Sequence, residues 1–121
     1  MLKYITTILI LYSFNGCYYN NEEDLLGNIV CDTTAVKYST HVSQIISTNC
    51  LICHSNGSSL GGGIVLEGYS ALKTQMGPNG RLIGAINHLP GYSAMPKGLS
   101  KLSACDIAKI EKWDNEGALN N

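Results

Sequence analysis

The sequence predicts an all-α domain of three to five helices, and the spacing of its apolar residues supports that prediction. The clearest pattern lies near the end of the chain, where Ile107, Ile110 and Trp113 recur on one face of a helix. A second helical pattern spans residues 40–50, and the middle of the chain contributes two shorter ones.

The first predicted helix begins at Thr40, whose side chain can cap its amino end. Its apolar positions are Val42, Ile45, Ile46 and Cys50. Residues 55–63 hold four glycines and three serines and carry no periodic apolar face. We therefore expect a helix that is followed by a loop.

Two short helices are predicted next, at residues 69–76 and 80–88, and Gly77-Pro78 is expected to stop the first of them. An irregular loop follows at residues 89–98. It contains Met95, which is followed by a proline.

The last helix has recognisable signals at both ends. Ser103 is positioned to cap its amino end, with Asp106 at the third helical position. Leu102 can pack against Ile107 across that end, and Gly117 is expected to terminate the helix.

The first helix leads into Cys50-Leu51-Ile52-Cys53-His54, a C-x-x-C-H motif. This spacing is the sequence requirement for covalent attachment of a c-type haem, because both thiols reach one edge of the porphyrin while His54 lies under the iron. Half of a zinc site is the alternative, but it needs two more ligands at comparable spacing. Cys31 and Cys105 each stand alone, with no Cys or His within four residues. We therefore predict one covalently bound haem c.

Residues 1–16 have the pattern of a signal peptide, since Lys3 precedes an uncharged, largely apolar run. The run ends in Gly16-Cys17, which resembles a bacterial lipoprotein signal, where cleavage leaves the cysteine as the lipid-bearing first residue. A secreted protein that is cut at a neighbouring site is the alternative. Either way, we expect an oxidising compartment outside the cytoplasm. With lipid on Cys17, the protein would be membrane-anchored and face the periplasm or the cell exterior.

Residues 17–35 are predicted to be the lipidated N-terminus and a polar tether. Their acidic run is more typical of a solvated linker than of a docking site. Residues 36–121 form the predicted domain, since removing the first 16 of 121 residues leaves 105, enough for one domain. The eight basic residues include Lys3, so seven remain against nine acidic ones. Without a basic stripe, we expect no nucleic-acid partner.

Cys31 and Cys105 are the two cysteines that have no predicted role in lipid or haem attachment. In an oxidising compartment they can form a disulfide. On the chain-entropy model, closing this loop would stabilise the folded state by about 4 kcal/mol. The alternative is a pair of buried thiols that behave as small apolar side chains.

The order of these features resembles a class I cytochrome c domain: a helix, C-x-x-C-H, short helices, a loop with Met95-Pro96 and a terminal helix with Trp113. The resemblance covers residues 36–118. It implies a cytochrome c-like fold of three to five helices around one covalently bound haem. The chain also looks like the small haem lipoproteins of Bacteroidetes-type bacteria.

The resemblance further implies that the first and last helices cross and that His54 and Met95 are the axial ligands of the iron. Family members often have a small glycine at the crossing, a position that Ser43 or Ser47 would have to fill here. Pro96 would stiffen the loop that carries Met95.

Three other side chains are alternative distal ligands. Met76 lies on the apolar face of a predicted helix, His88 ends one, and His41 lies in the first turn of another. A thioether raises the reduction potential, a second imidazole lowers it, and an empty site would let small molecules bind.

We therefore expect a monohaem c-type cytochrome that transfers single electrons to and from redox proteins of the envelope, and that is not an enzyme. The alternative is a haem-based ligand-binding or sensor module with an open or displaceable distal site. A third reading makes the haem only the folding core of a lipid-tethered partner module.

Overall fold

The computed structural model describes residues 31–121. The predicted signal peptide, the lipidation site Cys17 and the tether up to residue 30 lie outside the described residues. Within residues 31–121 the chain forms five α-helices and one π-helical turn, with no strand, so the all-α prediction is confirmed for this part. Two helices reach seven residues or more, α3 (Ser43–Asn49) and α7 (Ala104–Asn115). The shorter elements are the π-helical turn η1 (Tyr38–Val42), α4 (Leu51–His54), α5 (Tyr69–Lys73) and α6 (Leu82–Ile86).

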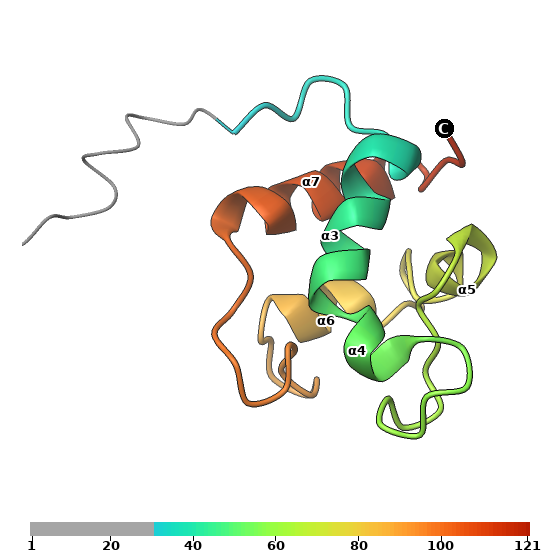
Figure 1. The fold of residues 1–121 in the computed structure, drawn as a ribbon. Helices are drawn as coiled ribbons and strands as arrows, with labels where there is room; N and C mark the ends of the chain where they lie inside the picture. Colours follow the sequence, from blue (N-terminus) through green and yellow to red (C-terminus); the bar gives the residue numbers. More distant parts are fainter. Residues whose placement is uncertain (1–30) are drawn as a thin grey trace, which may run out of the picture. The chain divides into compact units, whose positions relative to one another are not determined.

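Helical structure begins at Tyr38, two residues before the predicted cap (Figure 1). The Tyr38 N–H donates to the Asn121 side-chain oxygen (2.8 Å), and the Ser39 N–H donates to the Asn121 backbone oxygen (2.9 Å). Thr40 lies inside the turn, with its hydroxyl 3.0 Å from the His41 ring. The prediction that Thr40 caps this helix is therefore wrong, because a residue more than 80 positions away supplies the acceptors.

An aromatic cluster joins η1, α5 and α7. The Tyr38 ring stacks on Trp113 with centroids 5.7 Å apart, and Tyr69 meets both rings edge-on at 5.3 and 6.4 Å. Such pairs add about 0.5–1.5 kcal/mol beyond the area they bury. The Trp113 Nε1–H is also satisfied, since it donates to the Leu119 carbonyl (2.8 Å).

The first helical segment packs against α7 through η1. Val42 in this turn is completely buried. Ser47 is exposed, so it does not provide the small residue that was expected at a helix crossing; Ser43, at the junction with η1, is half-buried.

The signals at the ends of α7 act as predicted. Ser103 Oγ accepts the Asp106 N–H at 3.0 Å, and Leu102 and Ile107 are both buried beside this end. At the other end, Gly117 adopts φ +92°, a left-handed conformation that favours glycine. Its N–H and that of the next residue bind carbonyls of the last turn at 2.9 and 2.8 Å, which forms a Schellman motif.

The two short helices exist but end earlier than predicted. After α5 ends at Lys73, the next three N–H groups each bind a carbonyl three residues back, not four. The backbone has therefore tightened into turns well before Gly77-Pro78. The predicted helix at 80–88 shrinks likewise to Leu82–Ile86.

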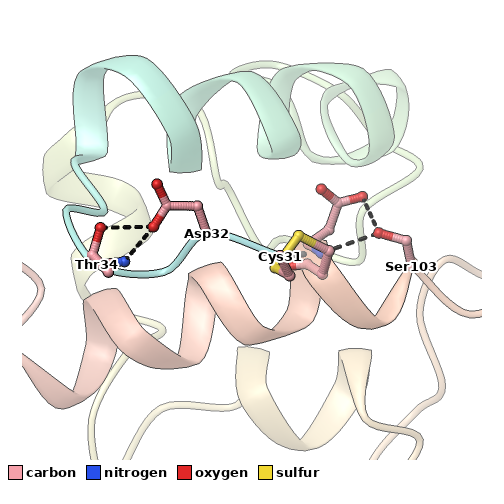
Figure 2. Close-up of a disulfide and its surroundings, with 6 residues drawn as sticks. Cys31, Asp32, Thr34 and Ser103 are labelled. Atoms are coloured by element: carbon pink, nitrogen blue, oxygen red, sulfur yellow. Dashed lines mark hydrogen bonds between the residues drawn. A yellow bond between two sulfur atoms is a disulfide. The ribbon is translucent and has the colours of Figure 1, made fainter. Parts of the chain in front are cut away.

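Cys31 and Cys105 form a disulfide, with Cα atoms 5.4 Å apart (Figure 2). The alternative of two buried thiols is wrong in this structure. The bond attaches the start of the described chain to the first turn of α7, so the compact unit begins at Cys31, ahead of the predicted boundary at residue 36. A disulfide is consistent with an oxidising compartment outside the cytoplasm.

Beside the disulfide, the side chain and backbone of Thr34 both donate to Asp32 Oδ1, at 2.7 and 2.9 Å (Figure 2). These hydrogen bonds lower the pKa of Asp32.

Between residues 31 and 121, none of the helices has the length and apolar character needed to cross a bilayer.

Replacing both Cys31 and Cys105 with alanine is expected to lower the free energy of unfolding by about 4 kcal/mol, because the unfolded chain regains the freedom that the crosslink removes. Chemical denaturation with and without reductant measures this. Reductant should destabilise the wild type and leave the double variant unchanged. Equal sensitivity of both proteins to reductant would contradict the prediction.

Candidate functional site

The C-x-x-C-H motif forms one helical turn at the point where α3 ends. The Cys50 N–H still bonds to the Ile46 carbonyl (2.9 Å), which completes α3. The Cys50 carbonyl then accepts the N–H groups of Cys53 (3.1 Å) and His54 (2.9 Å), which closes α4. Residues three and four apart share a face of a helix, so this turn brings the three side chains of the motif together.

These side chains line a cavity of about 340 Å³, within the size range of about 300–1,000 Å³ for cofactor sites. Met95, 41 residues after His54 in the chain, lines the same cavity. Its wall is otherwise mainly apolar, with Ile52, Leu60, Leu66, Leu82, Ile86, Pro96, Leu99 and Leu102. The predicted set Cys50, Cys53, His54 and Met95 thus meets at one apolar space.

A smaller cavity of about 110 Å³ shares part of this lining. The shared residues are His54, Leu66, Leu82 and Met95. The side chains of Gln75, Arg81, Tyr92 and Ser93 also line the smaller cavity. The cysteines line only the larger cavity, and these polar side chains only the smaller one.

His54 is held in one orientation. Its ring is buried, and Nδ1 lies 2.9 Å from the Ile64 carbonyl oxygen. A carbonyl can only accept, so Nδ1 carries a hydrogen, and in the neutral ring Nε2 is then the nitrogen with the free lone pair. This hydrogen bond is made by Nδ1 and not by Nε2. A neutral imidazole with its other nitrogen bound to a carbonyl is the usual form of a metal-ligating histidine.

Met95 is held through its backbone. Its N–H donates to the Ala85 carbonyl (3.0 Å), and its own carbonyl oxygen lies 3.0 Å from His88 Nε2. The thioether side chain is left to line both cavities.

The alternative ligands lie elsewhere. Met76 belongs to the buried apolar core, and His88 lines neither cavity. The His41 ring accepts the Lys37 N–H (3.2 Å) at the start of η1. The geometry therefore favours Met95 among the four, and its binding to iron stays a prediction.

The described residues do not supply the two further ligands that a structural zinc site at this motif would need. Cys50 is largely buried, and burial raises the pKa of its thiol to about 11. Among the described residues, no three His, Cys, Asp or Glu side chains are arranged to hold a metal ion.

Sequence reasoning missed two residues that shape the site, Ile64 and Gly61. A Cβ at Gly61 would lie 2.5 Å from the Cys53 carbonyl oxygen and 2.7 Å from His54 Nδ1, so only glycine fits there. The glycine-rich run at 55–63 predicted a loop, but it carried no signal of which glycine packs against the motif.

Comparisons with family models, with curated proteins and with solved structures found no significant match to this chain.

Gly61→Ala is expected to shift the His54 ring, because the new methyl group would overlap it and the Cys53 carbonyl. Overpacking of this kind costs about 1–3 kcal/mol. The NMR resonance of the His54 Nδ1 proton and the unfolding free energy measure the effect. Gly57→Ala is the control, since its Cβ would meet nothing within 4 Å and only its φ of +82° is unfavourable. An unshifted resonance in Gly61→Ala would contradict the packing argument.

Proposed function

We propose that this chain is a monohaem c-type cytochrome with a cytochrome c-like fold that transfers single electrons in the cell envelope. The observation that carries the proposal is the shared cavity: Cys50, Cys53, His54 and Met95 line one apolar space, although Met95 is far from the motif in sequence. Two thiols, one free imidazole nitrogen and one thioether are the four groups that a covalently bound, six-coordinate haem uses.

The residues present fit a haem. The Cys50 and Cys53 thiols would each add S–H across one vinyl group, which forms a carbon–sulfur and a carbon–hydrogen bond without an oxidant. The apolar wall suits the flat face of a porphyrin. Arg81, Tyr92 and Ser93 at the smaller cavity offer donors for its two carboxylates.

The ligand pair explains why we propose electron transfer and not catalysis. When bound, haem supplies an iron that gains and loses one electron. His54 Nε2 and the Met95 sulfur would occupy both axial positions, which leaves no open position for a substrate. Because a soft thioether favours the ferrous state, Met95 would raise the reduction potential relative to a second imidazole.

The rim of the large cavity is where we propose that redox proteins exchange electrons with the chain. Ile52, Leu60 and Leu99 line this cavity, yet they are 81%, 71% and 72% exposed. An exposed apolar rim beside the cofactor would let a partner approach closely.

We propose an envelope location because the disulfide needs an oxidising compartment and Cys17 follows a lipoprotein-like signal. The lipid on Cys17 would provide the membrane anchor. Metabolic labelling with a fatty acid, lost in Cys17→Ser, tests this part separately.

The purified protein is expected to carry one haem that survives denaturing electrophoresis and acid–acetone extraction, because two thioether bonds hold it. Cys50→Ser and Cys53→Ser should each leave a product with one thioether bond or none. Cys31→Ser with Cys105→Ser is the matched control and should keep the haem. Extraction of intact haem from the wild type would refute covalent attachment.

Met95→Ala is expected to convert a six-coordinate low-spin centre to a high-spin or water-bound one, lower the potential, and open the iron to carbon monoxide. Met95→His should stay low-spin at a lower potential. Visible spectra and a redox titration measure both, with Met76→Leu as the control. If Met95→Ala changes neither spectrum nor potential, the sulfur is not a ligand. A change in His88→Ala would then indicate a bis-histidine centre of lower potential, and no change in either variant would favour a haem-based ligand-binding module.

A further inference from the structure

We infer that His88 is a positioning residue that holds the Met95 backbone where its sulfur can reach the cofactor. The inference rests on the proposed ligation by Met95 and deepens it. It starts from an unusual residue at the end of a helix.

The carboxyl end of α6 is a Schellman motif with histidine at the position that usually holds glycine. The His88 N–H bonds to the Ala85 carbonyl (3.2 Å), and the Leu89 N–H bonds to the Gly84 carbonyl (2.9 Å). His88 has φ +56°, in the left-handed region where side chains are disfavoured. Local folding alone would therefore be served better by glycine.

The histidine side chain does something that glycine could not do. Its Nε2 lies 3.0 Å from the Met95 carbonyl oxygen, and since a carbonyl only accepts, Nε2 must donate. The Met95 N–H donates to the Ala85 carbonyl, which also receives the His88 N–H. Both backbone groups of Met95 are thus attached to the last turn of α6 and the residues that end it.

This attachment bears on the sulfur because a thioether is a weak ligand on a flexible side chain. Fixing the backbone on both sides of the side chain reduces the freedom that Met95 loses when its sulfur binds. The imidazole itself lines neither cavity, so His88 acts through Met95 and does not touch the cofactor site.

The test uses the full-length haem-containing protein and its His88→Gly variant. Glycine relieves the left-handed strain, so the unfolding free energy should stay the same or rise. The sulfur should nevertheless be displaced more easily. We expect the imidazole concentration that displaces Met95 to fall about three- to tenfold, the effect of one lost hydrogen bond. The thioether-to-iron charge-transfer band should disappear at a lower temperature.

Two comparisons separate positioning from helix capping. Ala118→Gly relieves the other positive φ of a non-glycine residue among the described residues (+46°) and should leave imidazole displacement unchanged. His88→Gln keeps a donor and His88→Leu removes it, with both variants strained alike. Displacing Met95 should therefore need more imidazole in His88→Gln than in His88→Leu. This pair of variants also tests the positioning role if the glycine variant folds poorly.

The outcomes distinguish the inference from the function it rests on. If the wild type shows no thioether band, Met95 is not a ligand and the proposed ligation fails. If the band is present and the Gly and Leu variants keep wild-type imidazole displacement, His88 only ends the helix and the inference is wrong.

Discussion

The site depends first on the hydrogen bond from His54 to the Ile64 carbonyl. A buried imidazole needs a partner, and the chain supplies one only ten residues later, after a loop that folds back on the motif. The Leu66 N–H closes the loop by donating to the His54 carbonyl (2.9 Å), and Gly61 lets it approach closely. One local contact therefore fixes the ring orientation, the hydrogen position on it and the wall of the cavity.

The opposite side of the cavity is supported in another way. Met95 is bound to the end of α6, and α6 packs against α7, where Asn87 donates to Glu111 (2.6 Å). The two proposed ligands thus have separate supports, a short local loop for His54 and a chain of contacts through two helices for Met95. In our proposal, this arrangement suits a strong imidazole ligand and a weaker thioether ligand that the protein has to hold.

The sequence predicted the parts of the fold and site that local chemistry determines. The α7 caps and the motif residues Cys50, Cys53 and His54 follow from spacing or from residue type, whereas Met95 follows from the resemblance to a class I cytochrome c domain. The first helix start could not be predicted, because its N–H groups are satisfied by Asn121 from the other end of the described chain. Ile64 acts through a backbone carbonyl, which any residue type supplies. For His88 the sequence suggests either a distal ligand or a ring that interacts with the carbonyls at the end of its helix, and nothing in it indicates a bond to a backbone oxygen seven residues away.

The contacts at the two ends of α7 explain how a fold with so few long helices can enclose a cavity. A helix of twelve residues is marginal alone, so its stability must come from packing. Here the disulfide holds its first turn, and the aromatic cluster and the Asn121 contacts hold the region of its last turn. Among the short elements, α4 and α6 carry residues that line the large cavity, and they span only four and five residues. In our proposal, Cys50, Cys53 and His54 at α4 and Met95 in the loop after α6 would hold one cofactor between them, and this shared binding would link the two short elements.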